Sequence, residues 1–176
     1  MKYLFDLLVI LLIYIGYSTA CNGWSAKIVS YKNCVDNGII TLPTKGLKVV
    51  LDKDCNIYVD GCLEITKSYK SAKGSYHIKK PPLPMIDGDM DFCELDKQIK
   101  SMPDAQKAID MFGLPVTCPV NAGKICAGAE KKFSITKYKN QLGMAAGTST
   151  IKVEVEHDVG KSCYELEFNL SKVKKG

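Results

Sequence analysis

The eight cysteines are the residues whose chemistry the sequence specifies best, and all of them lie after residue 20. Upstream of them, an apolar run over residues 7–16 follows Lys2, and Ser18-Thr19-Ala20 supplies the small residues that a signal peptidase needs. We therefore predict a secretory signal peptide over residues 1–20 and a single mature domain over residues 21–176. An even cysteine count in an oxidising compartment indicates paired disulfides. The expected destination is extracellular or the lysosomal lumen, with a bacterial lipoprotein acylated on Cys21 as the alternative.

Side chains for catalysis or metal binding are few. His157-Asp158 has the composition of a catalytic pair, but the Gly-rich calcium loop that secreted phospholipases carry upstream is missing. Asp87–Asp91 begins like an EF-hand loop, yet Phe92 and Gln98 stand where glycine and glutamate are required, so we predict a solvated turn. The other histidine has no acidic partner nearby in sequence. We predict no catalytic residue, no metal site, no cofactor and no enzymatic activity, with a hydrolase dependent on His157 as a distant alternative.

The charge distribution argues against a nucleic-acid partner. The net charge is +5, and every positive side chain is lysine, because arginine is absent. Proteins that bind nucleic acids rely on arginine for bidentate contacts to bases and phosphates. Lysines spread along the chain fit a solubilising surface, and they also favour an anionic membrane surface or a lipid headgroup.

Alternating apolar and polar residues predict an all-β protein. The alternation is strongest in Ile151–Val155 and Tyr164–Leu170, and Asp158 to Gly160 between them predicts a hairpin turn. Weaker strands are expected at Trp24–Tyr31, Ile39–Leu42, Leu47–Leu51, Cys55–Val59, Cys62–Thr66, Tyr76–Lys80 and Phe133–Tyr138, with turns at Asp36–Gly38 and Asp60-Gly61.

One segment interrupts this pattern. Strand alternation disappears from Pro81 to Pro119, which holds most of the prolines. Within it, apolar residues at helical spacing between Pro103 and Gly113 predict one short helix. The segment is rich in Met, Leu and Phe, which either pack it onto the sheets or form a surface that accepts apolar partners. We therefore expect one long irregular insertion with a short helix.

The second half of the mature chain resembles the ML lipid-recognition family, and within it the ganglioside-activator branch. The resemblance rests on Asp91-Phe92-Cys93, on Phe112–Gly123 with its Cys-Pro-x-x-x-Gly element, and on Gly160-Lys161-Ser162-Cys163 before the alternating last strand. It implies an immunoglobulin-like β-cup, a sandwich of two antiparallel sheets around an apolar cavity. Members of that family bind single lipids and present them to enzymes, receptors or transporters.

The resemblance also implies two disulfides, Cys34–Cys163 and Cys93–Cys118. Two cysteines that the activator branch places before Asp-Phe-Cys are missing here, and prolines occupy that region. The pairing of the four remaining cysteines stays open; they are Cys21, Cys55, Cys62 and Cys126.

The resulting hypothesis is a secreted, non-enzymatic lipid-binding or lipid-transfer protein that takes an acyl chain or similar apolar ligand and presents it to a partner or membrane. Its expected cavity and rim residues are Met85, Ile86, Phe92, Leu95, Met111, Phe112, Leu114, Met144, Ile151, Val153, Val155, Leu166 and Phe168. The alternative is a disulfide-stapled interaction protein with a filled core, such as a chemosensory accessory, an immune recognition factor or an inhibitor.

Overall fold

Alternation of side chains produces the two longest strands, β9 (Gly147–His157) and β10 (Gly160–Lys172), in a computed structural model that describes residues 20–173. They pair antiparallel around the turn formed by Asp158 and Val159. Gly160 follows that turn with φ +151°, and a Cβ there would lie 2.8 Å from the Ile39 side chain, so glycine is required. The predicted signal peptide lies outside the described residues except for Ala20.

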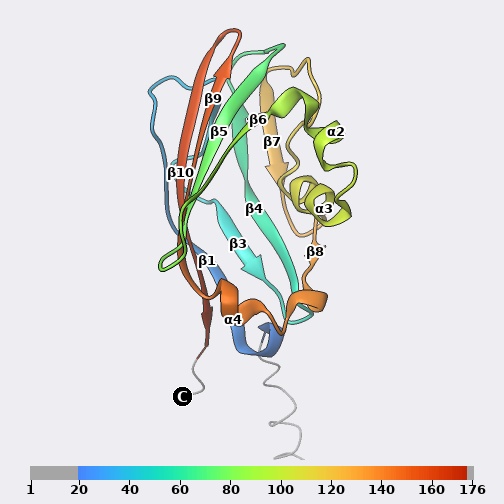
Figure 1. Cartoon of the computed structure of the whole chain (residues 1–176). Coiled ribbons are helices and arrows are strands. Elements are labelled where there is room, and N and C mark those ends of the chain that lie inside the picture. The colour runs from blue at the N-terminus through green and yellow to red at the C-terminus, as the bar shows by residue number, and fades with distance from the viewer. Residues whose placement is uncertain (1–19, 174–176) are drawn as a thin grey trace, which may run out of the picture.

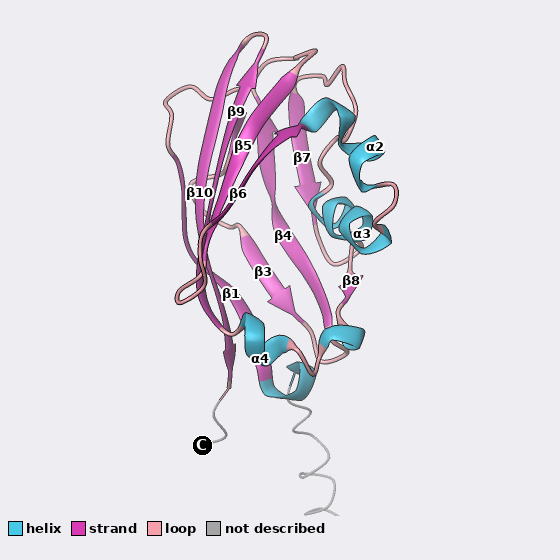
Figure 2. Ribbon diagram, in the orientation of Figure 1, coloured by secondary structure: helices cyan, strands magenta, loops and turns pink. Residues whose placement is uncertain are grey.

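Two antiparallel sheets form an all-β, immunoglobulin-like sandwich, as predicted (Figures 1 and 2). The first sheet has the order β1-β10-β9-β5-β6, in which β1 is Trp24–Asn33, β5 is Ala72–Lys79 and β6 is Ile86–Asp91. The second sheet is built around β4 (Asn56–Ile65), which pairs with four short strands. These are β2 (Ile40–Thr41), β3 (Lys48–Leu51), β7 (Gly123–Ala127) and β8 (Phe133–Ser134).

The helices are short and lie at the margins of the sandwich. The 3₁₀ turn η1 (Ala20–Gly23) precedes β1, and η2 (Phe92–Glu94), α2 (Leu95–Ile99) and α3 (Pro103–Phe112) follow β6. A third 3₁₀ turn, η3 (Thr136–Tyr138), and α4 (Leu142–Ala145) join β8 to β9. Among residues 20–173, no helix has the length and apolar character needed to cross a membrane.

The segment from Pro81 to Pro119 is more regular than predicted. It contains β6 and two helices, α2 and α3, where one irregular insertion with a single short helix was expected. The expected solvated turn at Asp87–Asp91 is wrong for the same reason, since these residues pair with β5 throughout. Aspartate and glycine have low β propensity, but pairing with β5 overrides it. The predicted helix α3 is present, with Pro103 in its first turn and Gly113 as a left-handed C-cap.

Two further predictions need correction in the second sheet. The expected turn at Asp60-Gly61 is absent, and β4 runs straight through it. Gly61 adopts φ +145°, and a Cβ there would lie 3.1 Å from Leu47, so the glycine lets the two chains approach without reversing direction. The strand expected over Phe133–Tyr138 ends at Ser134. The Ile135 N–H still donates to the Cys55 carbonyl at 2.8 Å, but Cys55 has a left-handed backbone with φ +58°, which ends the extended pairing.

A hydrogen-bonded carboxylate closes the turn between β3 and β4. Asp52 accepts hydrogen bonds from the Asn56 backbone N–H at 2.9 Å, from the Asp54 N–H at 2.9 Å and from Lys132 Nζ at 3.2 Å. Desolvation raises the pKa of this carboxyl, but the hydrogen bonds from Asn56, Lys132 and Asp54 outweigh it and lower the pKa to about 2. The ionised form therefore stabilises the fold above the ordinary aspartate pKa, and this contribution is lost as pH falls through about 2.

We predict that Asp52→Asn lowers the free energy of unfolding by about 1–2 kcal/mol at pH 7 and by progressively less as pH falls from 4 to 2. Urea unfolding across this pH range measures the difference. Asp54→Asn is the matched control, because its side chain makes no hydrogen bond among the described residues. A constant difference between the two variants at all pH values would contradict the prediction.

Candidate functional site

The inner face of the first sheet carries a contiguous group of apolar and aromatic side chains at its centre. Cross-strand register places Ile151 opposite Leu166 and Ile78, and it places Val153 opposite Tyr164 and Tyr76. Side chains of one strand that are two residues apart share a face, so all six point between the sheets. We call this group the central patch; its members are Tyr76, Ile78, Ile151, Val153, Tyr164 and Leu166.

Fully buried side chains gather at the two ends of the sandwich. With the β9–β10 turn at the top, as in Figure 1, the lower core contains Cys21, Ala26, Leu51, Cys55, Leu142 and Leu170. The upper core contains Ile39, Ile65, Tyr69, Ala72, Val120 and Val155. The central patch lies between these clusters, and each of its members is only half-buried. Val59, on the inner face of β4 between the two clusters, is only 4% exposed. The first sheet is therefore less completely buried at its centre than at its two ends, whereas the second sheet keeps a buried side chain at this level.

The sheets approach most closely along one edge. There β1 of the first sheet lies beside β3 of the second, and the Leu47 N–H donates to the Tyr31 hydroxyl at 3.3 Å. At the opposite edge, β6 leads into α2 and α3 (Figure 1). Leu95, Ile99 and Met111 are the buried side chains of these two helices. The interior is closed along β1 and β3. Residues 94–117, which contain α2 and α3 and which we call the helical segment, lie at the opposite edge.

Exposed apolar side chains surround the connection between β5 and β6. Leu83, Met85 and Ile86 are more than half exposed, at 55%, 57% and 54%, and Met144 of α4 is 74% exposed. Lys80 Nζ donates to the Ala146 carbonyl at 2.6 Å, which ties this connection to the end of α4. We call these four residues the apolar rim. Ile86 pairs with Ile78, so the rim is continuous with the central patch.

A second opening lies beside α3. A groove of about 670 Å³ is lined by Lys107, Asp110, Met111, Gly113, Leu114, Lys131, Lys132 and Ser134. A Cβ on Gly113 would lie 3.6 Å from the Ile125 side chain, so the end of α3 lies against β7. The N-terminal half of α3 is held by Asp104, which accepts hydrogen bonds from Lys137 and Tyr138. Those hydrogen bonds lower the pKa of Asp104. The groove combines apolar side chains with three lysines.

A further depression is charged. It has a volume of about 650 Å³ and crosses the outer face of the first sheet, where Asp89, Glu154 and Glu156 line it together with Lys73 and Lys161. Such a surface does not suit an apolar ligand.

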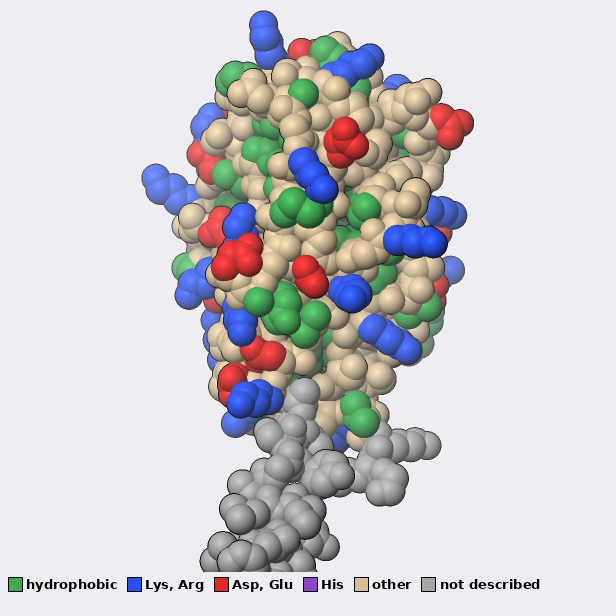
Figure 3. Space-filling model, turned by 180° about the vertical axis from the view of Figure 1, so that it is seen from behind, with side chains coloured by type: hydrophobic (Ala, Val, Ile, Leu, Met, Phe, Trp, Pro, Cys, Tyr) green, Lys and Arg blue, Asp and Glu red, His purple; other side chains and the backbone are tan. Residues whose placement is uncertain are grey.

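On the face drawn in Figure 3, acidic side chains and lysines are intermingled, and hydrophobic side chains form only small groups between them.

The predicted cavity and rim residues fall into three environments. Exposed residues are Met85, Ile86, Phe112 and Met144. Half-buried residues are Phe92, Leu114, Ile151, Val153, Leu166 and Phe168, of which Phe92 and Val153 pack against the upper core and Phe168 against the lower core. Leu95, Met111 and Val155 are buried. The structure brings Ile151, Val153 and Leu166 together, whereas Leu95 and Met111 hold the helical segment. Tyr76, Ile78 and Leu83 were missed, although alternation in β5 pointed to the first two.

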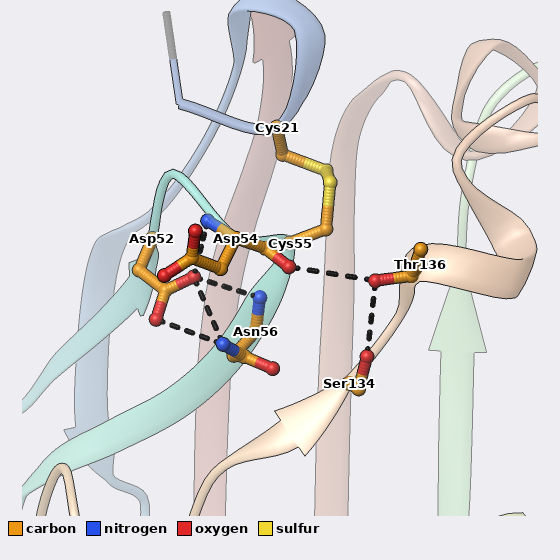
Figure 4. The surroundings of a disulfide bond; sticks show 7 residues. All are labelled: Cys21, Asp52, Asp54, Cys55, Asn56, Ser134 and Thr136. Atoms are coloured by element: carbon orange, nitrogen blue, oxygen red, sulfur yellow. Dashed lines mark hydrogen bonds between the residues drawn. A yellow bond between two sulfur atoms is a disulfide. The ribbon is translucent and has the colours of Figure 1, made fainter. Parts of the chain in front are cut away.

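All eight cysteines are paired. The two bonds implied by the family resemblance, Cys34–Cys163 and Cys93–Cys118, are present. The pairing left open resolves into Cys21–Cys55 and Cys62–Cys126. Cys21–Cys55 links the start of β1 to the turn before β4 beside the Asp52 hydrogen bonds, and so joins the two sheets (Figure 4). Because the Cys21 sulfur is bonded to Cys55, it has no free thiol for acylation.

The candidate catalytic pair is not assembled. His157 is buried and its Nε2 lies 2.9 Å from the Ser162 hydroxyl. Asp158 instead accepts hydrogen bonds from the backbone N–H groups of Lys70 and Ser71. Among residues 20–173, no group of three or more His, Cys, Asp or Glu side chains is arranged to hold a metal ion.

The expectation that the sequence holds no N-glycosylation acceptor is wrong. Asn169-Leu170-Ser171 has the form of an N-glycosylation acceptor, a signal that the sequence contains in full. Asn169 is half-buried on the outer face of β10, and its side-chain amide donates to Thr148 at 3.0 Å. A glycan at this position would lie on the outer face, away from the central patch.

The structure thus defines a disulfide-stapled β-sandwich whose buried side chains form two clusters. No protein-family model matches the chain. It is 34% identical over 154 residues to the sporozoite-associated mosquito saliva protein 1 of Anopheles gambiae, an alignment that covers 86% of this chain and 84% of the relative. The chain belongs to the family of that saliva protein. Four disulfides and a relative found in saliva identify it as a secreted, disulfide-stapled protein.

The Cys93–Cys118 bond closes the helical segment, so we predict that replacing both cysteines with alanine loosens α2 and α3 while the sheets stay folded. Loop closure over 25 residues accounts for about 3 kcal/mol in the chain-entropy model. Hydrogen exchange should become faster within residues 94–117 and stay unchanged in β9 and β10. The control removes Cys62 and Cys126, which staple neighbouring strands. Equal protection of residues 94–117 in both variants would refute the tethering role.

Proposed function

We propose that the protein is a non-enzymatic lipid-binding protein of the β-cup type, as the resemblance to the ML family implies. An acyl chain or similar apolar group would enter between the sheets and lie against the central patch. The observation that carries the proposal is the divided core, because half-buried apolar side chains between two buried clusters leave room for an apolar ligand. The lipid would then be presented to a membrane, a partner enzyme or a receptor.

Simple energetics support this mechanism. Transfer of each methylene from water into an apolar environment is favourable by ~0.8 kcal/mol, so a long acyl chain supplies a large driving force before the costs of binding are subtracted. Ligand binding would also cover the half-exposed side chains of Ile151 and Leu166. The apolar rim offers a first contact, and Lys107 and Lys131 beside α3 suit an anionic or polar headgroup.

The competing function is an interaction protein that uses its exposed apolar side chains to contact another protein. Met102 and Phe112 of the helical segment are 50% and 42% exposed, which favours such a surface. The printed name of the relative describes a saliva protein associated with sporozoites, and it names no lipid. The two functions differ in one measurable respect, which is whether the interior takes up a ligand.

We predict that Ile151→Trp blocks lipid uptake and leaves the melting temperature within about 2 °C of wild type. An open interior accommodates the larger side chain, whereas overpacking a filled core costs typically 1–3 kcal/mol. The test combines thermal unfolding with native mass spectrometry of protein from an oxidising host, before and after lipid extraction and re-addition of a fatty acid. Thr150→Trp on the outer face is the control. A clearly lower melting temperature, with no lipid bound to wild type, would favour the interaction protein.

We also predict that Phe112→Asp weakens fatty-acid uptake about three- to tenfold without unfolding the protein. The side chain is 42% exposed, so a carboxylate there costs little stability, but it repels an approaching apolar or anionic ligand. Fluorescent fatty-acid titration measures the change. Val29→Asp is the control, because Val29 is 50% exposed and lies in β1, at the opposite edge of the first sheet from β6. Unchanged uptake in Phe112→Asp would remove this residue from the entrance.

A further inference from the structure

Four polar side chains lie inside the sandwich next to the upper core. Tyr69 and His157 are 5% and 8% exposed, and their rings lie 4.4 Å apart between centroids. Ser162 is 1% exposed, and Tyr164 extends from the same inner face of β10. We call these four residues the polar cluster. The neighbouring upper core is otherwise composed of aliphatic side chains.

His157 needs a hydrogen-bond partner that the described residues do not supply. The Ser162 hydroxyl accepts from the Ile40 N–H at 2.9 Å and lies 2.9 Å from His157 Nε2. The opposite ring nitrogen, Nδ1, is buried and has no partner among residues 20–173. If Ser162 donates to Nε2, then Nδ1 carries a proton without an acceptor; in the other tautomer, Nδ1 is an acceptor without a donor. Either tautomer leaves one buried atom unsatisfied.

The Tyr164 hydroxyl is the second such group. It is buried without a hydrogen-bond partner in the described part of the chain. Burial raises the pKa of Tyr164, and the Ser162 hydroxyl, which is close to the phenol but outside hydrogen-bond geometry, offsets part of that rise. The ring of Tyr164 belongs to the central patch, whereas its hydroxyl faces the polar cluster. This one side chain therefore connects the open interior to the buried polar groups.

Two unsatisfied polar atoms in one place are unusual, since buried polar groups in proteins are almost always hydrogen-bonded. Each such atom costs about 1–3 kcal/mol of stability when it stays unpaired. A phenylalanine in place of Tyr164 would avoid that cost while filling the same volume. A polar group that enters from the interior would supply the hydrogen-bond partner that this hydroxyl lacks.

We propose that the polar cluster binds the hydroxyl group of a neutral amphiphile, such as a sterol or a long-chain alcohol, so that the ligand lies with its polar end inward. This inference rests on the proposed lipid-binding function. A hydroxyl donates one hydrogen bond and accepts others, which matches an unsatisfied imidazole nitrogen and an unsatisfied phenol. Its apolar body would then lie along the central patch.

The electrostatics of the cluster favour a neutral ligand over a carboxylate. No lysine belongs to the cluster, and burial lowers the pKa of His157, which keeps the imidazole uncharged at neutral pH; nearby Asp158 opposes this shift only in part. Burying a carboxylate without a cation is far more costly than burying a hydroxyl. The lysines beside α3 lie at the surface, where they contact solvent or a headgroup left outside.

The test compares 1-dodecanol with n-dodecane, which differ only in the hydroxyl group. Both ligands compete with the neutral fluorescent probe N-phenyl-1-naphthylamine for the wild-type protein and for Tyr164→Phe. We expect wild type to bind dodecanol about five- to tenfold more tightly than dodecane, and Tyr164→Phe to lose most of that preference. The ligand-free variant should also melt at a higher temperature than wild type, since it lacks an unsatisfied buried hydroxyl. Tyr31→Phe is the control, because the Tyr31 hydroxyl already accepts from Leu47.

Each outcome decides the inference. Equal affinity of wild type for the two ligands, or the same preference in Tyr164→Phe, would overturn it while leaving lipid binding intact. A lower melting temperature of Tyr164→Phe would show that the hydroxyl has a partner within the protein, which also overturns it. Displacement of the probe by neither ligand, with no probe uptake, would instead remove the proposed function and this inference together.

Discussion

The two sheets are held together at their ends and along one edge, and the rest of the structure depends on this constraint. A β-sandwich ordinarily packs its two inner faces against each other over their whole area. Here most buried side chains belong to separate upper and lower cores, and the inner side chains of the first sheet between them are only half-buried. Incomplete burial at the centre of the first sheet removes part of the hydrophobic stabilisation that a sandwich of this size would otherwise have. The two ends of the sandwich must therefore supply the stabilisation that the centre lacks.

Two of the four disulfides lie at these ends of the sandwich. Cys21–Cys55 lies within the lower core and links η1, which leads into the first strand of one sheet, to the turn before β4 of the other. Cys93–Cys118 lies against the upper core and closes the helical segment. Cys34–Cys163 and Cys62–Cys126 reinforce the two sheets separately. Because a disulfide acts mainly on the unfolded chain, it stabilises such a fold without filling the interior.

Strong local patterns were predictable from the sequence, and long-range pairing was not. The β9–β10 hairpin followed from strict alternation around Asp158-Val159-Gly160, and α3 followed from its proline and glycine boundaries. In contrast, β6 was missed because Asp-Gly-Asp gives a turn-like local signal, and only its pairing with β5 makes it a strand. Gly61 looked like a turn residue for the same reason. The inner-facing residues of β9 and β10 were identifiable from alternation alone. The division of the core into two clusters depends on the distance between the sheets, and no local sequence pattern encodes that distance.

The polar cluster shows why alternation cannot identify a binding site by itself. His157, Ser162 and Tyr164 occupy inner-face positions of the last hairpin, in register with aliphatic residues that pack as a core requires. In a fully packed sandwich, these positions would favour aliphatic or phenylalanine side chains, because polar atoms there lose hydration and gain little. An interior that receives a polar ligand changes that balance, since hydrogen bonds formed inside a low-dielectric space are stronger than those in water. The proposed ligand would account for polar residues at these inward positions, because it would complete both the packing and the hydrogen bonding around them.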